Sequence, residues 1–116
     1  MELIDNAKVE KFHFHENFQQ TLAGADQGLK TFEIWRVSLT PGAEIPPYRH
    51  PAEVAVLTMQ GTGCVLVDEK QVDIRPDTTL VLPSGVSRQV VNTGGEDLVF
   101  LLVRGLVPEE IFKQVG

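Results

Sequence analysis

The sequence has few cysteines, histidines and large aromatic residues, with one Cys, one Trp, one Tyr and three His in 116 residues. Because Cys64 stands alone, an intrachain disulfide is excluded and a reducing compartment is favoured. No apolar stretch approaches the length of a bilayer, and the amino terminus lacks the basic start and apolar run of a secretory signal. We therefore expect a cytoplasmic protein.

Positive charge is also scarce. Ten Lys and Arg residues stand against 16 Asp and Glu, which gives a formal net charge of −6, and the basic residues are scattered along the chain. This balance argues against nucleic acid and anionic membranes as partners. The chain also lacks a Gly-rich phosphate loop, a Ser-containing nucleophile elbow and a Cys-x-x-Cys pattern.

What is present from Thr31 onward is a series of short β-branched runs separated by turn residues, the pattern of an all-β sandwich or barrel. The length fits one domain over residues 1–116. Turn residues such as Pro41-Gly42, Gln60-Gly61 and Thr93-Gly94-Gly95 separate the runs. The predicted strands are 32–39, 45–50, 53–59, 63–67, 71–75, 78–82, 87–92 and 98–104.

The ends of the chain predict further elements. Residues 9–18 are consistent with a strand, which could lie across a partner subunit, and residues 23–30 with a loop. Pro, two acids and a following Lys predict a short C-terminal helix over residues 108–113. The last strand is apolar on both alternations, which implies a second layer outside the barrel wall, so we expect a homodimer.

Two blocks of the sequence share a specific arrangement of turns. Gly42 and Gly61 bracket the first block, and Pro83, Gly85 and Asn92 punctuate the second. These blocks resemble the two signature motifs of the cupin superfamily, over roughly residues 31–103. The resemblance implies a double-stranded β-helix, or jelly-roll barrel, in a small single-domain cupin of the conserved-barrel type.

The resemblance further implies where a metal would bind, because cupins place His-x-His, a Glu and a third His around it. In this chain those positions hold Tyr48, His50, Val54 and Arg88, with Glu53 one residue before Val54. Arginine has no lone pair to donate to a metal. A divalent ion about 4 Å from the guanidinium would be repelled by roughly 8 kcal/mol. We therefore expect a degenerate site with no metal cofactor.

Arg88 places a fixed positive charge where related proteins hold a cation. A guanidinium that faces a pocket binds carboxylate or phosphate through paired hydrogen bonds. Tyr48 and His50 alternate on one strand and would share its inward face, where an imidazole can also transfer protons. The sequence therefore predicts that the barrel binds a small anionic metabolite through Tyr48, His50 and Arg88, with Glu53 and Arg36 as further ligand-binding candidates.

Other interpretations remain open at this point. Trp35 and Arg36 lie on opposite faces of one strand, so only one of them can line the barrel. Arg88 could pair with Glu53 at the rim, with Tyr48 and His50 as packing residues in a purely structural or regulatory dimer.

The enzyme alternative is a divergent metal-dependent cupin of the dioxygenase or isomerase type. It would bind a divalent transition metal through His50 with Glu53, or with His13 and His15. The His13-x-His15 pair could also be the exposed face of a strand whose Phe12 and Phe14 point inward.

Overall fold

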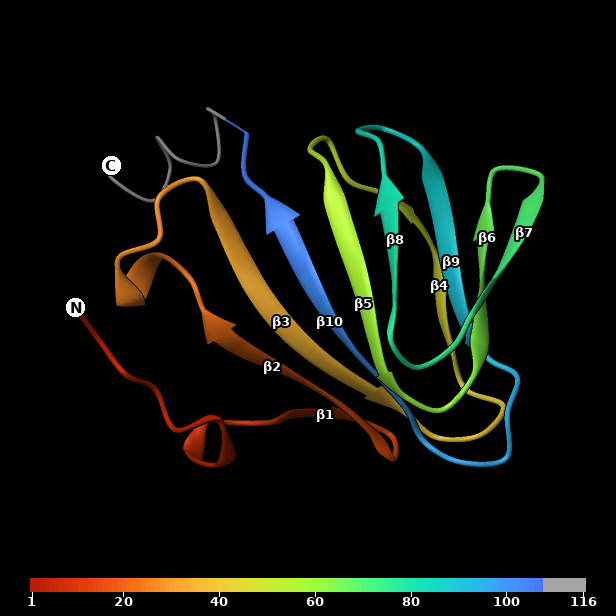
Figure 1. The fold of residues 1–116 in the computed structure, drawn as a ribbon, viewed down its shortest axis with the longest axis horizontal. Helices are drawn as coiled ribbons and strands as arrows, with labels where there is room; N and C mark the ends of the chain where they lie inside the picture. The colour runs from red at the N-terminus through yellow and green to blue at the C-terminus, as the bar shows by residue number, and fades with distance from the viewer. Residues whose placement is uncertain (108–116) are drawn as a thin grey trace.

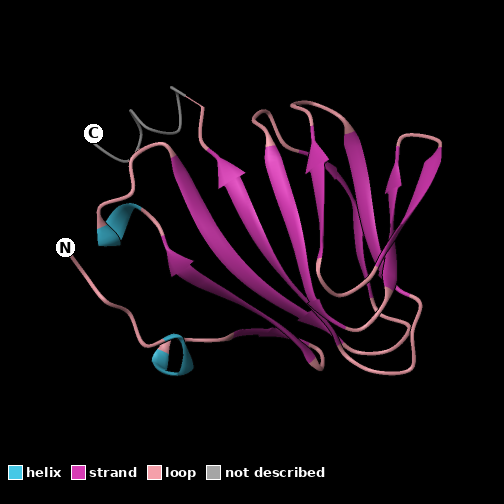
Figure 2. Ribbon diagram, in the orientation of Figure 1, coloured by secondary structure: helices cyan, strands magenta, loops and turns pink. Residues whose placement is uncertain are grey.

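The computed structural model describes residues 1–107 of the chain. Within them, ten β-strands form two antiparallel sheets that face each other, accompanied by two short 3-10 helices (Figures 1 and 2). This is the predicted all-β jelly roll. The predicted C-terminal helix, 108–113, lies outside the described residues. No helix in residues 1–107 is long and apolar enough to cross a membrane.

The elements follow one another along the chain with short connections. They are η1 (Asn6–Lys8), β1 (Phe12–Phe14), β2 (Asn17–Ala23), η2 (Ala25–Gln27), β3 (Phe32–Leu39), β4 (Glu44–Arg49), β5 (Val54–Gln60), β6 (Gly63–Val67), β7 (Lys70–Ile74), β8 (Thr78–Leu82), β9 (Ser87–Asn92) and β10 (Leu98–Gly105).

The strands divide into a six-stranded sheet, in the order β1-β2-β3-β10-β5-β8, and a four-stranded sheet, in the order β4-β9-β6-β7. In Figure 1 the six-stranded sheet extends toward the amino terminus, well past the four-stranded sheet. Strand β10 lies between β3 and β5, and its register pairs Leu102 with both Trp35 and Val56. The chain thus alternates between two layers, as in a jelly roll.

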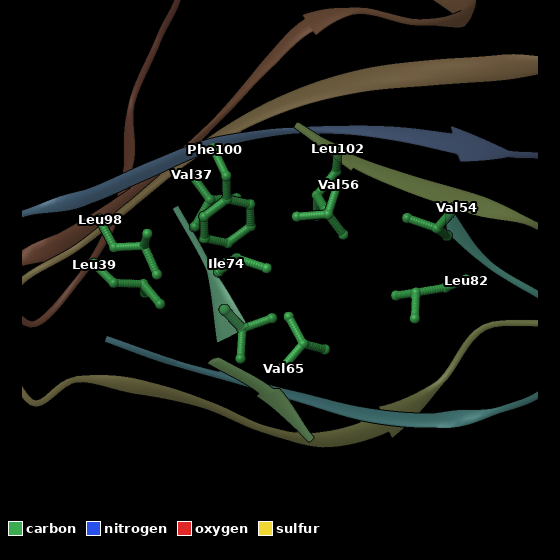
Figure 3. Close-up of a cluster of buried hydrophobic side chains, with 11 residues drawn as sticks. Val37, Leu39, Val54, Val56, Val65, Ile74, Leu82, Leu98, Phe100 and Leu102 are labelled. Atoms are coloured by element: carbon green, nitrogen blue, oxygen red, sulfur yellow. The ribbon is translucent and has the colours of Figure 1, made fainter. Parts of the chain in front are cut away.

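The core fills the space between the two layers. Alternate residues of β10, Leu98, Phe100 and Leu102, are buried and face Val65 and Ile74 of the four-stranded sheet (Figure 3). Full burial of one such side chain stabilises the fold by about 1.5–3 kcal/mol. The alternation of strand residues therefore decides which side chains reach the interior.

Two residues of the motifs, Gly61 in a turn and Asn92 at the end of β9, hold the barrel in specific ways. Gly61 has a φ of 78°, and a Cβ added there would lie 2.4 Å from the carbonyl oxygen of Asp97. The buried Asn92 amide donates to the carbonyl oxygens of Leu39 and Glu96 at 2.9 and 2.8 Å. Glycine and asparagine at these positions are therefore structural requirements of the fold.

The amino-terminal region differs from the prediction. The single strand predicted over 9–18 is wrong, because a turn at His15, with a φ of 58°, separates β1 from β2. Strand β2 continues to Ala23, and the predicted loop 23–30 contains η2. The extent of β2 was missed because Gln20, a polar residue, is fully buried there, where its amide donates to the carbonyl oxygens of Asn6 and Val9. A polar residue thus occupies a position that strand patterns expect to be apolar.

Strand β4 forms one edge of the four-stranded sheet and carries Pro46 and Pro47. Its pairing with β9 shifts register between Ile45 and Tyr48, which is where the prolines lie. Proline has no N–H to donate to a sheet, so it is tolerated at an edge and at bulges.

Candidate functional site

A cavity of about 430 Å³ opens between β4 and the extended part of the six-stranded sheet. Its walls come from five strands, and its lining includes Phe14, Trp35, Val37, Tyr48, Leu102 and Arg104. The volume lies within the range of about 300–1,000 Å³ found for small-molecule sites. The cavity is thus large enough for a metabolite, with mostly apolar walls and few charged groups.

Arg88 lies between the sheets on the same face of β9 as Val90 and is 0% exposed. Its Nε donates to the carbonyl oxygen of Val86 at 3.0 Å and its Nη2 to that of Pro83 at 3.3 Å. Its Nη1 is buried without a hydrogen-bond partner, and no carboxylate in residues 1–107 pairs with it. Arg88 is therefore a buried cation without a counterion in the described part of the chain.

Tyr48 connects Arg88 to the cavity. The two residues are directly paired across β4 and β9, and the Arg88 Cζ lies 5.4 Å from the centroid of the Tyr48 ring. Tyr48 lines the cavity, whereas Arg88 is not among the lining residues. The guanidinium charge therefore lies behind an aromatic wall of the cavity.

A second arginine, Arg104, reaches the cavity from β10. Its Cζ lies 4.0 Å from the centroid of the Trp35 ring, and its Nη1 forms an ion pair with Glu33. Glu33 and Trp35 are the partners of Arg104 and Leu102 in the β3–β10 register, so all four side chains share one face. Each of the two facing sheets thus contributes one arginine stacked on one aromatic ring of the cavity wall.

His50 follows β4 and is 4% exposed. Its Nδ1 is 3.1 Å from Arg104 Nη2, and its Nε2 is 2.8 Å from the carbonyl oxygen of Gly105. A guanidinium only donates and a carbonyl only accepts, so Nδ1 accepts a hydrogen bond and Nε2 carries the proton. Both nitrogens of His50 are therefore engaged with the protein.

The residues at the family's metal positions do not fit a metal. Neither nitrogen of His50 has a free lone pair, Val54 is a buried alkyl group, and Arg88 is a cation. Residues 1–107 contain no cluster of three or more His, Cys, Asp or Glu side chains that could hold a metal ion. The arrangement is suited to hydrogen bonding and charge, and it offers no coordination set.

The remaining predicted site residues are spread over the molecule. Glu53 is exposed, lies just before β5, and forms no ion pair with Arg88. Arg36 donates to Gln20 at 2.8 Å on the face of β3 opposite Trp35, so the structure does not bring it near Arg88. Trp35, in contrast, lines the cavity.

The other two histidines are also separated from His50. His13 is exposed on β1 and stacks edge-on against Phe18, with ring centroids 6.2 Å apart. His15 lies in the turn that follows, so the two imidazoles do not share one strand face. The metal set proposed from His50 with Glu53, His13 or His15 is thus not assembled in residues 1–107.

The sequence reasoning missed Arg104 and Glu33. The signal for Arg104 was present, because Leu98, Phe100 and Leu102 alternate toward the core and Arg104 is the next residue on that face. Finding Glu33 required the register between β3 and β10, which the sequence pattern does not specify.

Comparison with known proteins agrees with this architecture. Residues 35–104 match the cupin domain family. The chain is 32% identical over 102 residues to auxin-binding protein 1 of Arabidopsis thaliana, covering 79% of this chain and 52% of that protein. The chain thus spans about half the length of this curated relative.

Solved structures of low sequence identity share the fold. The polyketide cyclase RemF from Streptomyces resistomycificus has a TM-score of 0.80 at 16% identity, covering 99% of this chain and 92% of that one. A predicted oxalate decarboxylase from Thermotoga maritima has a TM-score of 0.80 at 22% identity, covering 91% and 100%. With its jelly-roll fold, its two turn motifs and the match over residues 35–104, the chain belongs to the cupin domain family.

Proposed function

We propose that this cupin binds a small organic anion between its two sheets, without the metal that is usual in the family. The observation that carries the proposal is the Arg88 guanidinium, fully buried with Nη1 unpaired and with no carboxylate partner among residues 1–107. A buried charge without a partner is costly. An anion in the adjoining cavity would lower that cost.

The charges around the cavity support the same proposal. Arg104 is balanced by Glu33, whereas Arg88 has no such balance within the described residues. The interior therefore carries about one uncompensated positive charge beside Tyr48, in a region of low dielectric where Coulomb interactions are strong. Tyr48 itself can donate a hydrogen bond to an anion from the cavity wall.

The metal-free part of the proposal rests on His50 and Arg88. His50 is the only family metal ligand retained in the motif, and both of its nitrogens are hydrogen-bonded to protein groups. Arg88 stands where the third histidine would supply a lone pair. We therefore propose that the guanidinium replaces the metal as the positive centre of the barrel.

A small-molecule ligand also agrees with one relative. The Arabidopsis protein, 32% identical over 102 residues, is named for binding auxin. This supports a binding role for the cavity and assigns neither that ligand nor a reaction to this chain.

The test compares anions with neutral molecules of the same shape. Benzoate and malonate, with benzamide and malonamide as their uncharged counterparts, are titrated into the purified protein by isothermal titration calorimetry. We expect at least one acid to bind, and to bind at least about tenfold more tightly than its amide. Equal affinity for acid and amide, or no binding of either acid, would refute the anion proposal.

We also propose a homodimer formed through the outer face of the six-stranded sheet. That face carries apolar residues paired across neighbouring strands: Ile34 with Val103, Val103 with Ala55, Ala55 with Val81, and Leu101 with Leu57. Val81 is 67% exposed. Apart from Arg36, which is paired with Leu101 and donates to Gln20, the strip is uncharged, and a second copy of the chain is the occupant that we propose for it.

The lone Cys64 is buried and unpaired, which suits a protein of the reducing cytoplasm, and we propose that location.

A further inference from the structure

The geometry points to a ligand that combines an aromatic body with a single carboxylate, and to Arg104 as the residue that binds the carboxylate. This inference rests on the proposed function and adds to it the class of ligand and the cation that touches it. Nothing in the family's metal motif identifies Arg104, which lies on β10 outside both motif blocks.

Arg104 has donors left for a ligand. A guanidinium carries five N–H groups, and the structure gives Arg104 two partners, Glu33 at Nη1 and His50 at Nη2. The side chain is 16% exposed and lines the cavity. The remaining N–H groups have no partner among residues 1–107, and we assign a ligand carboxylate to them.

The same contacts fix the orientation of Arg104. Glu33 holds one end of the guanidinium, the buried imidazole of His50 holds the other, and the Trp35 ring lies against its face at 4.0 Å. A guanidinium held on three sides loses little further freedom when a ligand binds. Glu33, His50 and Trp35 are therefore positioning residues for Arg104.

The walls of the cavity select the body of the ligand. Phe14, Trp35 and Tyr48 contribute three aromatic rings, and Val37 and Leu102 contribute aliphatic surface. Such a lining favours a flat apolar group that can stack against rings, and it disfavours small hydrophilic anions that lose hydration without gaining contacts. A ligand of this kind presents its charge at one end only.

Trp35 can report on occupation of the cavity. Its indole Nε1 is buried and has no hydrogen-bond partner in residues 1–107, so a ligand in the cavity does not touch it directly. The guanidinium of Arg104 lies over the Trp35 ring, so a ligand that binds Arg104 or stacks on the ring changes the surroundings of the indole.

Arg104 and Arg88 then have different roles. Arg104 lines the cavity and is the contact residue, whereas Arg88 is fully buried behind Tyr48 and acts through its charge.

The experiment uses 2-naphthoate as the aromatic acid, 2-naphthol as its uncharged counterpart and malonate as the small hydrophilic anion. Affinities are measured by calorimetry for wild type, Arg104→Gln, Arg104→Lys and Arg49→Gln. Arg49 is the matched control, because it is exposed at the end of β4 and, within residues 1–107, its side chain donates only to the carbonyl oxygen of Gly85. The indole N–H signal of Trp35, the only tryptophan, is followed by NMR in the same titrations.

We expect 2-naphthoate to bind wild type and Arg49→Gln equally, and at least about tenfold more tightly than either 2-naphthol or malonate. Arg104→Gln should lower the affinity for 2-naphthoate by about tenfold or more and leave the affinity for 2-naphthol unchanged. The affinity of Arg104→Lys for 2-naphthoate should lie between those of wild type and Arg104→Gln, since lysine keeps the charge but lacks the planar pair of N–H donors. The Trp35 signal should shift with 2-naphthoate and not with malonate.

Other outcomes separate the two proposals. Tighter binding of malonate than of 2-naphthoate would overturn the aromatic class and leave the anion proposal standing. Unchanged 2-naphthoate affinity in both folded Arg104 variants would overturn the role of Arg104. Failure of both acids to bind wild type would overturn this inference together with the proposed function. If Arg104→Gln does not fold, the comparison of Arg104→Lys with wild type decides the role of Arg104.

Discussion

The imidazole Nδ1 of His50 accepts a hydrogen bond from the Arg104 guanidinium across 3.1 Å. The imidazole of a metal-binding cupin would direct a lone pair at the metal, and here that lone pair is committed to a cation. Together with the hydrogen bond from Nε2 to Gly105, this contact makes His50 a brace between the end of β4 and the end of β10. The retained histidine thus has a structural use that does not require a metal.

We predict that the protein retains no stoichiometric transition metal. The test is elemental analysis of protein expressed in medium supplemented with iron, zinc, manganese and nickel, and purified without chelator. The expected result is less than about one tenth of an equivalent of any metal, because a coordination set is not assembled at His50. A full equivalent that disappears in His50→Ala would contradict the prediction and favour the metal-dependent alternative.

Arg88→Met should reduce anion binding with little effect on stability. The methionine removes an uncompensated buried charge, which is favourable, and leaves the carbonyl oxygens of Pro83 and Val86 without a donor, which is unfavourable. We expect the free energy of unfolding in urea to change by no more than about 1 kcal/mol, and the affinity for the tightest-binding acid to fall by about tenfold. A loss of several kcal/mol with unchanged affinity would assign Arg88 to the fold alone.

Two glycines with similar backbone angles should respond differently to alanine. Gly61 and Gly85 have φ angles of 78° and 79°, but only at Gly61 would the new Cβ meet backbone, at 2.4 Å from the Asp97 oxygen. Gly85→Ala should therefore cost about 1 kcal/mol of unfolding free energy, and Gly61→Ala about 3 kcal/mol or more. Equal losses of unfolding free energy for the two variants in urea denaturation would show that the backbone at Asp97 moves to accommodate the new methyl group.

Cys64 should be protected until the protein unfolds. Burial, followed by the nearby Asp73 carboxylate, raises the pKa of the Cys64 thiol above its ordinary value of 9.0. We expect slow reaction with a thiol reagent in native protein at neutral pH and fast reaction in urea. Because a raised pKa favours the neutral thiol in the folded state, the contribution of Cys64 to stability is complete below 9.0 and is lost as the pH rises above it.

The matched control for that prediction is Cys64→Ala. Above pH 9.0 the free energy of unfolding of Cys64→Ala should decrease less than that of wild type, as measured by urea denaturation on both sides of pH 9.0. Rapid labelling of native protein at neutral pH would contradict the burial of the thiol.

Val81→Lys should disrupt the proposed dimer. Val81 lies at the exposed end of the apolar strip on the outer face of the six-stranded sheet, where two copies of a lysine would be brought close together. Light scattering after size-exclusion chromatography should change from dimer to monomer mass. Gln71→Lys is the control, since Gln71 is exposed on β7 of the other sheet. A monomeric wild type would refute the dimer.

The sequence predicted the strands after Thr31 well and the site only in part. Turn residues mark the ends of those strands, and alternation placed Arg88 and Val90 on one face. Strand β2 was missed beyond Phe18, since its polar Gln19 and Gln20 conceal the pattern. Long-range contacts explain this difference, because the partners of Gln20 lie in η1 and the segment after it.

The difference between local sequence pattern and long-range contacts also explains what was predicted of the cavity. The motif identified Tyr48, His50 and Arg88 because the family aligns them, and it gave no information on what each side chain touches. The hydrogen bond from Arg104 to His50 joins residues 54 positions apart in sequence, so only the folded register could reveal it.

The prolines of β4 have a consequence for the edge of the sheet beside the cavity. Pro46 and Pro47 remove N–H donors from β4, the edge strand of the four-stranded sheet. An extended peptide from another molecule therefore finds few donors there with which to form sheet hydrogen bonds. The rim of the sheet beside the cavity, which Pro46 helps to line, therefore offers few donors for pairing with another chain.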